Sequence, residues 1–120
     1  MNSGPNPVSR GRQVLDIIGT DTTFEIHTFR DGERCWVGKC IHCNARMTVK
    51  MNGETGFTIE HIHPRCAAGT NDLRNLAMAC GGCNNEKGRN HDQGVGKDDR
   101  ADEIVAALQA KRLARWRDPK

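Results

Sequence analysis

Three side chains suited to acid–base or metal chemistry lie within the seven residues TIEHIHP, at positions 58–64. Glu60 offers a hard oxygen ligand of the kind that Mg²⁺ and Mn²⁺ prefer. His61 and His63 offer neutral imidazoles, which can take a proton from water near neutral pH. These residues alone leave two alternatives open: metal-assisted chemistry, or a folded core with a few surface histidines.

Two cysteine pairs with Cys-x-x-Cys spacing enclose this segment. They are CIHC, with Cys40 and Cys43, and CGGC, with Cys80 and Cys83. Four thiolates complete the tetrahedral shell of a structural zinc ion and leave no open position. Disulfides are the alternative, but 6 cysteines in 120 residues is below the density of disulfide-built scaffolds. The spacing therefore predicts a structural zinc site.

The remaining cysteines and histidines lack such partners. Cys35 falls in a predicted strand and is expected to be buried as a small apolar side chain, whereas Cys66 has no assigned role. A lone histidine is more often structural than catalytic, and we expect a structural role for three of them: His27, His42 and His91.

The composition favours a small protein of a reducing compartment. A chain of 120 residues with 4% aromatic residues forms one domain with a thin core, which zinc would stabilise. The first residues, MNSGPNPVSRGRQ, lack the apolar segment of a secretory signal, and no run of 18 apolar residues could cross a membrane. We therefore expect a cytoplasmic protein without a membrane partner, a setting in which paired cysteines favour metal.

The strands must position these groups. Alternation over residues 22–29, an Asp-Gly turn and a return strand at 35–38 predict an N-terminal β-hairpin. Further strands are expected at 46–51 and 57–62, and residues 76–80 form a short apolar segment. Alternation in a strand would point Glu60 and His61 to opposite faces, so an ideal strand does not project them together.

Two helices are expected after these strands. CNNEKGRN predicts a short helix that ends at Gly88 or soon after. A second helix begins after Asp98 or Asp99, either of which can cap it. Its apolar stripe continues into Arg112 and Arg115, which leaves open a docked helix with a solvated basic end or a phosphate contact. We expect three parts: a disordered arm over 1–12, a zinc-stabilised domain over 13–92, and a linker with a basic helix over 93–120.

Residues 40–88, about 40% of the chain, resemble the four-cysteine form of the HNH endonuclease family. The shared features occur in order: Cys-x-x-Cys, an acidic residue before His-Ile, a glycine-containing loop, Asn-Leu, and Cys-x-x-Cys-Asn-x-x-Lys-Gly. The resemblance implies an α+β fold, a small zinc-stapled domain with an N-terminal β-hairpin, a ββα-metal motif and a C-terminal helix. Within the motif, a strand at 57–62, a loop, a strand at 75–79 and a helix from about 83 are implied.

The resemblance also implies roles for individual residues in DNA hydrolysis or nicking. Glu60 and Asn84 would hold one catalytic cation, Mg²⁺ or Mn²⁺, and His61 would be the general base that activates water. Asn75 would brace the loop that orients His61, and His63 would assist the metal or the phosphate. Backbone phosphates would be met by four cationic side chains: Lys87, Arg89, Arg112 and Arg115.

The implied partner is double-stranded DNA, within a phage or restriction complex or alone. Two positions depart from the commoner pattern, because Glu60 stands where aspartate is usual and Asn84 where histidine is also found. Two other classes stay open. A zinc-stabilised nucleic-acid-binding module without catalysis is one, and a zinc adaptor for protein partners is the other. Neither gives a reason for Glu60, His61 and Asn84 to occur together.

Overall fold

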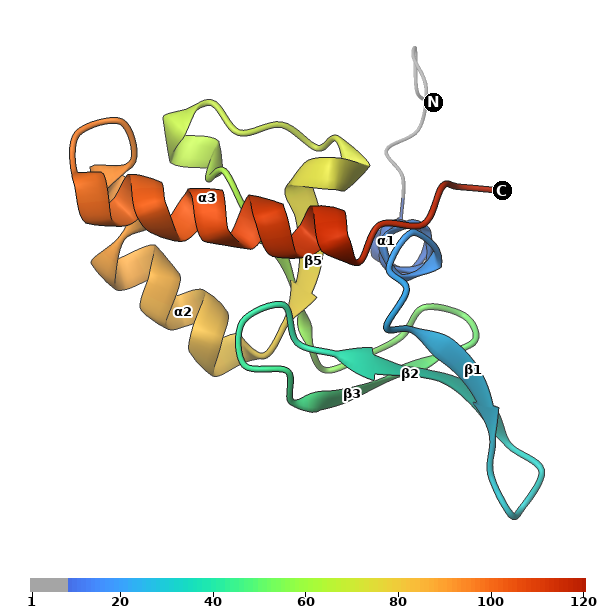
Figure 1. The fold of residues 1–120 in the computed structure, drawn as a ribbon. Coiled ribbons are helices and arrows are strands. Elements are labelled where there is room, and N and C mark those ends of the chain that lie inside the picture. Colours follow the sequence, from blue (N-terminus) through green and yellow to red (C-terminus); the bar gives the residue numbers. More distant parts are fainter. Residues whose placement is uncertain (1–8) are drawn as a thin grey trace, which may run out of the picture.

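The computed structural model describes residues 9–120, and within them helices pack around two small antiparallel sheets (Figure 1). Strands β1 (Glu25–Thr28), β2 (Arg34–Lys39) and β3 (Arg46–Lys50) form one sheet in that order. Strands β4 (Thr58–His61) and β5 (Leu76–Ala79) form the other. The predicted α+β class and N-terminal hairpin are confirmed.

Helix α1 (Arg10–Gly19) was not predicted from the sequence. It begins at the Ser9 cap, whose hydroxyl accepts a hydrogen bond from the Arg12 N–H at 3.2 Å. Its buried face starts only at Val14 and continues through Ile17 and Ile18, after a polar first turn that resembles a flexible arm. Of the predicted arm over residues 1–12, Ser9 therefore caps the helix and residues 10–12 are helical, while residues 1–8 lie outside the described residues.

In the three-stranded sheet an aromatic ring packs directly against a glycine. Antiparallel pairing sets Trp36 opposite Ile26 and Val49. The fully buried Phe24 ring packs against Gly38, where a Cβ atom would lie 2.3 Å from the ring. Only glycine permits this contact. The same sheet buries Cys35, as expected.

The second sheet and its helix follow the predicted ββα order. In the antiparallel pairing of β4 with β5, Glu60 lies opposite Ala77 and His61 opposite Leu76. All four residues of β5 are buried, so this strand is central to the core. Helix α2 (Gly81–Asn90) begins at the Cys80 cap and ends soon after Gly88, as predicted. In this sheet the predicted strand ends differ from the observed ones by about one residue, whereas the first strand of the hairpin begins later than predicted.

The segment between β4 and β5 contains two short 3₁₀ turns, η1 (Arg65–Ala67) and η2 (Leu73–Asn75), where an irregular loop was predicted. Gly69 lies between them, against the carbonyl of His63. A Cβ atom at Gly69 would lie 1.8 Å from that oxygen, so the loop closes only around glycine.

Helix α3 (Asp99–Ala114) crosses the molecule and ends beside α1 (Figure 1). Asp98 caps it as predicted, accepting from the Arg100 N–H at 2.9 Å. A further 3₁₀ turn, η3 (Asp92–Gly94), connects it to α2. The buried stripe includes Ala101, Val105 and Leu108 and ends at Arg112. None of the helices formed within residues 9–120 has both the length and the apolar character needed to span a bilayer.

Arg112 of α3 and Arg115, the residue that caps the end of α3, were expected to meet DNA, but both are buried, which corrects that prediction. Arg112 is 1% exposed and donates to the carbonyl oxygens of Leu76 at 2.8 Å and Thr20 at 3.0 Å. Arg115 donates to the carbonyl of Lys39 at 3.1 Å and to the side chain of Asn44. Both guanidinium groups satisfy main-chain acceptors in the interior. Burial lowers the pKa of Arg112, and Asp21 acts in the opposite direction.

Candidate active site

The four paired cysteines converge as predicted. Their sulfur atoms all lie within 4.8 Å of one another, and Cys80 Sγ lies 3.9 Å from both Cys40 Sγ and Cys43 Sγ. Zinc–sulfur bonds of about 2.3 Å place the corners of a tetrahedron about 3.8 Å apart. The four cysteines, Cys83 included, are therefore positioned to hold one structural zinc ion.

Local backbone geometry brings the first pair to the second. The turn after β2 closes through a hydrogen bond from Cys40 N to Ala45 O at 2.9 Å. It uses Asn44 in the left-handed region (φ 62°), a conformation that asparagine tolerates. Ile41 N donates to Met78 O at 3.0 Å, which joins this turn to β5 just before Cys80. The cysteines positioned to hold zinc are thus attached to the core strand of the ββα unit.

Main-chain N–H groups lower the pKa of one of these thiols. Burial raises the pKa of Cys40, but backbone N–H groups, those of Cys80 and His42 among them, outweigh it and lower that pKa to about 7. The pKa of Cys83 is raised, because its thiol bonds to the Cys80 sulfur and is partly desolvated. A bound zinc ion deprotonates coordinating thiols in either case.

His61, at the end of β4, lines an open groove of about 300 Å³. Asn84 of α2 lines the same groove, together with Arg65 and Asp92. The Nε2 atom of His61 lies 2.7 Å from Asn71 Oδ1. Because an amide oxygen only accepts, Nε2 carries the hydrogen in this arrangement. The Nδ1 atom of the neutral ring is then the one that can accept a proton.

Asn75 makes the bracing contacts that the resemblance implied. Its Oδ1 accepts from His63 N at 2.8 Å, and its Nδ2 donates to His63 O at 3.0 Å and Thr70 O at 2.8 Å. One side chain therefore binds the loop that follows His61 at two points, His63 and Thr70. The ring of His63 points elsewhere, with Nε2 2.7 Å from Ala67 O, and is not among the residues that line the groove.

Glu60 lies on the opposite face of β4, so the expected alternation with His61 is confirmed. Its side chain is 1% exposed, and Oε1 accepts from His42 Nε2 at 2.7 Å. The ammonium of Lys87 is 3.9 Å from the same oxygen. Its other oxygen, Oε2, is buried and has no hydrogen-bond partner within residues 9–120. An unpartnered carboxylate oxygen in the interior is a costly feature that a cation would relieve.

Asn84 approaches the same face of β4 as Glu60. Its Nδ2 donates to Thr58 Oγ1 at 3.2 Å, and Thr58 precedes Glu60 by two residues, on the same side of the strand. This contact engages the amide nitrogen and leaves the amide oxygen as the atom suited to a cation. Mg²⁺ commonly keeps several waters and needs only one or two protein oxygens. Glu60 and Asn84 therefore fit the ligand set of a hard divalent cation.

The two cationic residues of α2 have different surroundings. Lys87 is 3% exposed and donates to Asp92 Oδ1 at 2.6 Å and to His61 O at 3.1 Å. The prediction that Lys87 contacts a phosphate is therefore wrong, because its buried ammonium group joins α2 to β4. Arg89 is exposed and lines a hollow of about 520 Å³ that it shares with Asn84. It remains available to a phosphate.

Sequence reasoning missed four contributors to this region. His42 was expected to be structural, and three others were not singled out: Arg65, Asn71 and Asp92. The position of His42 inside CIHC was the available signal, since a residue between two zinc ligands is held rigidly. No comparable signal marks Asn71, which is exposed in the loop.

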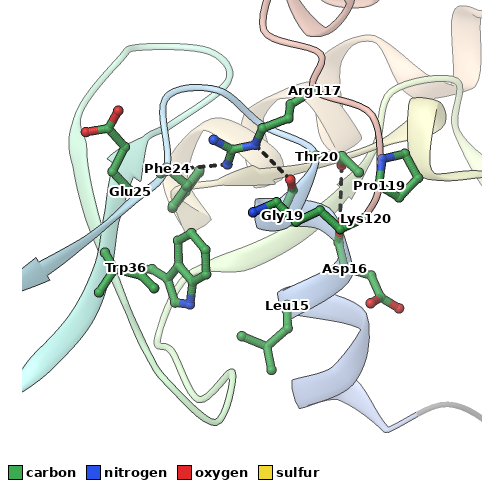
Figure 2. A pocket seen from close by; sticks show the side chains of 11 residues that line it. Leu15, Asp16, Gly19, Thr20, Phe24, Glu25, Trp36, Arg117, Pro119 and Lys120 are labelled. Atoms are coloured by element: carbon green, nitrogen blue, oxygen red, sulfur yellow. Dashed lines mark hydrogen bonds between the residues drawn. The ribbon is translucent and has the colours of Figure 1, made fainter.

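A second hollow, of about 590 Å³, lies apart from these residues, between α1, the first sheet and the C-terminal residues (Figure 2). Its lining is mainly apolar and includes Leu15, Phe24 and Trp36. Arg117 borders it and donates to Gly19 O at 3.0 Å and to Phe24 O at 3.1 Å. Its lining includes no residue predicted for catalysis or metal binding.

Comparison with known proteins agrees with the geometry. A family model described as HNH endonuclease matches residues 40–99, which is half of the chain. Searches of curated proteins and of solved structures returned no match. The matched segment begins at Cys40, the first of the four clustered cysteines, and contains β4, β5 and α2. The chain therefore belongs to the HNH endonuclease family.

Proposed function

We propose that this protein is a metal-dependent endonuclease that hydrolyses phosphodiester bonds of double-stranded DNA. The observation that carries the proposal is the shared groove of His61 and Asn84, beside a four-cysteine zinc site. A histidine and an amide from two different elements meet there at an accessible surface. The family match supports nuclease chemistry in general, and the residue roles are our inference.

His61 acts as the general base in this proposal. Its Nδ1 takes a proton from the attacking water, while Asn71 holds the hydrogen on Nε2 at 2.7 Å and keeps the ring oriented. Asn75 positions the loop that follows His61 through its three bonds to main-chain atoms. These contacts of Asn71 and Asn75 are already formed in the protein without DNA.

Glu60 and Asn84 would hold the divalent cation, Mg²⁺ or Mn²⁺. When bound, such a cation neutralises charge on the phosphorane and on the leaving 3′ oxygen. Asn84 borders both the face of Glu60 and the groove of His61, so it connects the two halves of the site. The exposed side chains of Arg65 and Arg89 border the groove and its neighbour, where they would meet DNA phosphates.

A cytoplasmic setting is part of this proposal, because a thiolate zinc site persists best under reducing conditions. The alternative is a zinc-stabilised nucleic-acid-binding module without catalysis. One contact favours it: Lys87 already places a positive charge 3.9 Å from Glu60 Oε1, where a cation would otherwise act.

Nicking of supercoiled plasmid with Mg²⁺ or Mn²⁺ separates these functions. We expect His61→Ala to abolish nicking with folding and zinc content intact. His27→Ala is the matched control, since His27 is exposed on β1 and away from the groove, and it should cleave like the wild type. Equal nicking by wild type and His61→Ala would overturn the assignment of the base.

A further inference from the structure

The bond between His42 and Glu60 joins the zinc site to the candidate cation site. We propose that His42 is a positioning residue: it sets the orientation of the Glu60 carboxylate and thereby the affinity for the catalytic cation. This inference rests on the proposed function, because it assigns Glu60 to that cation.

The backbone of His42 is held from several directions. His42 lies between two zinc ligands, and its N–H donates to Cys40 Sγ at 3.4 Å. Its carbonyl oxygen accepts from Lys111 Nζ of α3 at 3.1 Å. The imidazole is 18% exposed and projects from this fixed turn toward β4. The zinc site therefore supplies a rigid base for the ring.

The His42 ring forms a hydrogen bond with one carboxylate oxygen of Glu60 and none with the other. A carboxylate only accepts, so His42 Nε2 donates to Oε1 at 2.7 Å. The remaining oxygen, Oε2, is buried and has no partner among the described residues. A buried oxygen without a donor is expensive unless another group satisfies it, and a hard cation does so.

Lys87 is the competitor that makes this orientation matter. Its Nζ is 3.9 Å from Glu60 Oε1 and is kept near by Asp92 at 2.6 Å and by His61 O at 3.1 Å. The terminal torsion of glutamate is soft, so a carboxylate without His42 can turn toward the ammonium. A closer Glu60–Lys87 ion pair would take the negative charge away from the cation. His42 prevents that pairing by occupying Oε1.

The test measures Mn²⁺ affinity directly, by the magnetic resonance signal of free Mn²⁺ in zinc-loaded protein. His42→Phe keeps the ring volume and removes the donor, whereas His42→Gln retains an N–H in nearly the same place. We expect His42→Phe to weaken Mn²⁺ binding roughly 10- to 100-fold, the usual effect of losing a partner of a metal ligand. His42→Gln should restore most of the affinity, and zinc content should stay at the wild-type level in both.

Cleavage provides an independent readout of the same role. The Mn²⁺ concentration that gives half-maximal nicking should rise in His42→Phe, while the rate at saturating Mn²⁺ stays close to that of the wild type. If His42→Phe does not fold, His42→Asn replaces it, because the shorter amide keeps polarity but does not reach Glu60. Equal Mn²⁺ affinity for the wild type and for the folded variant that lacks the donor would overturn the inference.

Glu60→Gln distinguishes this inference from the proposed function. If Glu60→Gln loses Mn²⁺ binding while His42→Phe binds Mn²⁺ as tightly as the wild type, the cation site stands but His42 has no positioning role. Unchanged binding in Glu60→Gln overturns both assignments of Glu60. Mn²⁺ binding that depends on both residues, in a protein that cleaves no DNA, supports the role of His42 and overturns the nuclease function.

Discussion

Glu60 and His61 are consecutive in β4, yet their side chains lie on opposite sides of the strand. Glu60 is buried against His42 and near Lys87, whereas His61 faces an accessible groove and contacts Asn71. Because they lie on opposite faces of β4, the two side chains have different partners. A substitution around one of them should therefore change one property and leave the other intact.

Asn71→Ala tests the side of the strand that carries His61. Without the Asn71 side chain the His61 ring is free to rotate, so we expect the maximal cleavage rate to fall roughly 10- to 100-fold. This loss is part of the roughly 10²–10⁴-fold rate increase that a general base supplies as a whole. Asn71 is exposed, so thermal stability and Mn²⁺ affinity should stay unchanged. Asn90→Ala, at an exposed asparagine near the end of α2, is the matched control for plasmid nicking. A wild-type rate in Asn71→Ala would argue against an orienting role.

Gly69→Ala tests the closure of the loop behind His61. A Cβ atom at this position would lie 1.8 Å from His63 O, so the loop must shift and strain the bonds of Asn75. We expect about 1–3 kcal/mol of lost stability in urea unfolding, together with reduced nicking. Gly56→Ala is the control, because a Cβ atom there meets no atom of the described residues within 4 Å. Similar urea midpoints for the two variants would contradict the close approach.

The parts predicted correctly from the sequence depend on short local patterns. The Cys-x-x-Cys spacing located the four-cysteine cluster that could hold a metal ion, and alternation in β4 predicted the opposite faces of Glu60 and His61. The loop brace of Asn75 came from the family resemblance and has the expected contacts. In each case the determining residues are close in the sequence or belong to one motif.

The incorrect parts depend on contacts between distant segments. The stripe on α3 correctly placed Arg112 with the apolar residues, but its partners are carbonyl oxygens of Thr20 and Leu76, at distances of 92 and 36 residues along the chain. No local sequence pattern shows that these carbonyl oxygens lie close together in the interior and need a side-chain donor. The same holds for Lys87, whose acceptors Asp92 and His61 O meet only in the fold.

Arg112→Met should therefore reduce stability rather than DNA binding. The guanidinium donates to four acceptors, which include Leu73 O and Thr20 Oγ1, and each buried acceptor left unpaired costs about 1–3 kcal/mol. We expect a total loss of roughly 3–5 kcal/mol in urea unfolding, close to the cost of breaking a buried charged network. In the fraction that stays folded, the salt dependence of DNA affinity should match the wild type. A reduced salt slope with normal stability would restore the phosphate role of Arg112.

Arg89→Met is the opposite case and uses the same substitution at an exposed position. Arg89 lies beside Asn84 on the surface, so its loss should weaken binding to unrelated DNA sequences about equally. The slope of log affinity against log salt should fall by about one, the change for one lost phosphate contact. Urea unfolding should be unaffected. Affinity and slope equal to those of the wild type would exclude Arg89 from the DNA surface.

Removal of zinc should unfold the domain, because the four sulfur ligands join the turn after β2 to the start of α2 and few aromatic side chains support the core. Structural zinc contributes on the order of 10 kcal/mol, which is comparable with the whole stability of a small domain. We expect one zinc per chain in native protein by mass spectrometry, and loss of helical circular dichroism when a chelator removes it under mild denaturant. Cys43→Ser should lower zinc affinity, whereas Cys66→Ser, at an exposed cysteine outside the cluster, should not. Zinc-free native protein with an unchanged melting temperature would refute the structural role of the four cysteines.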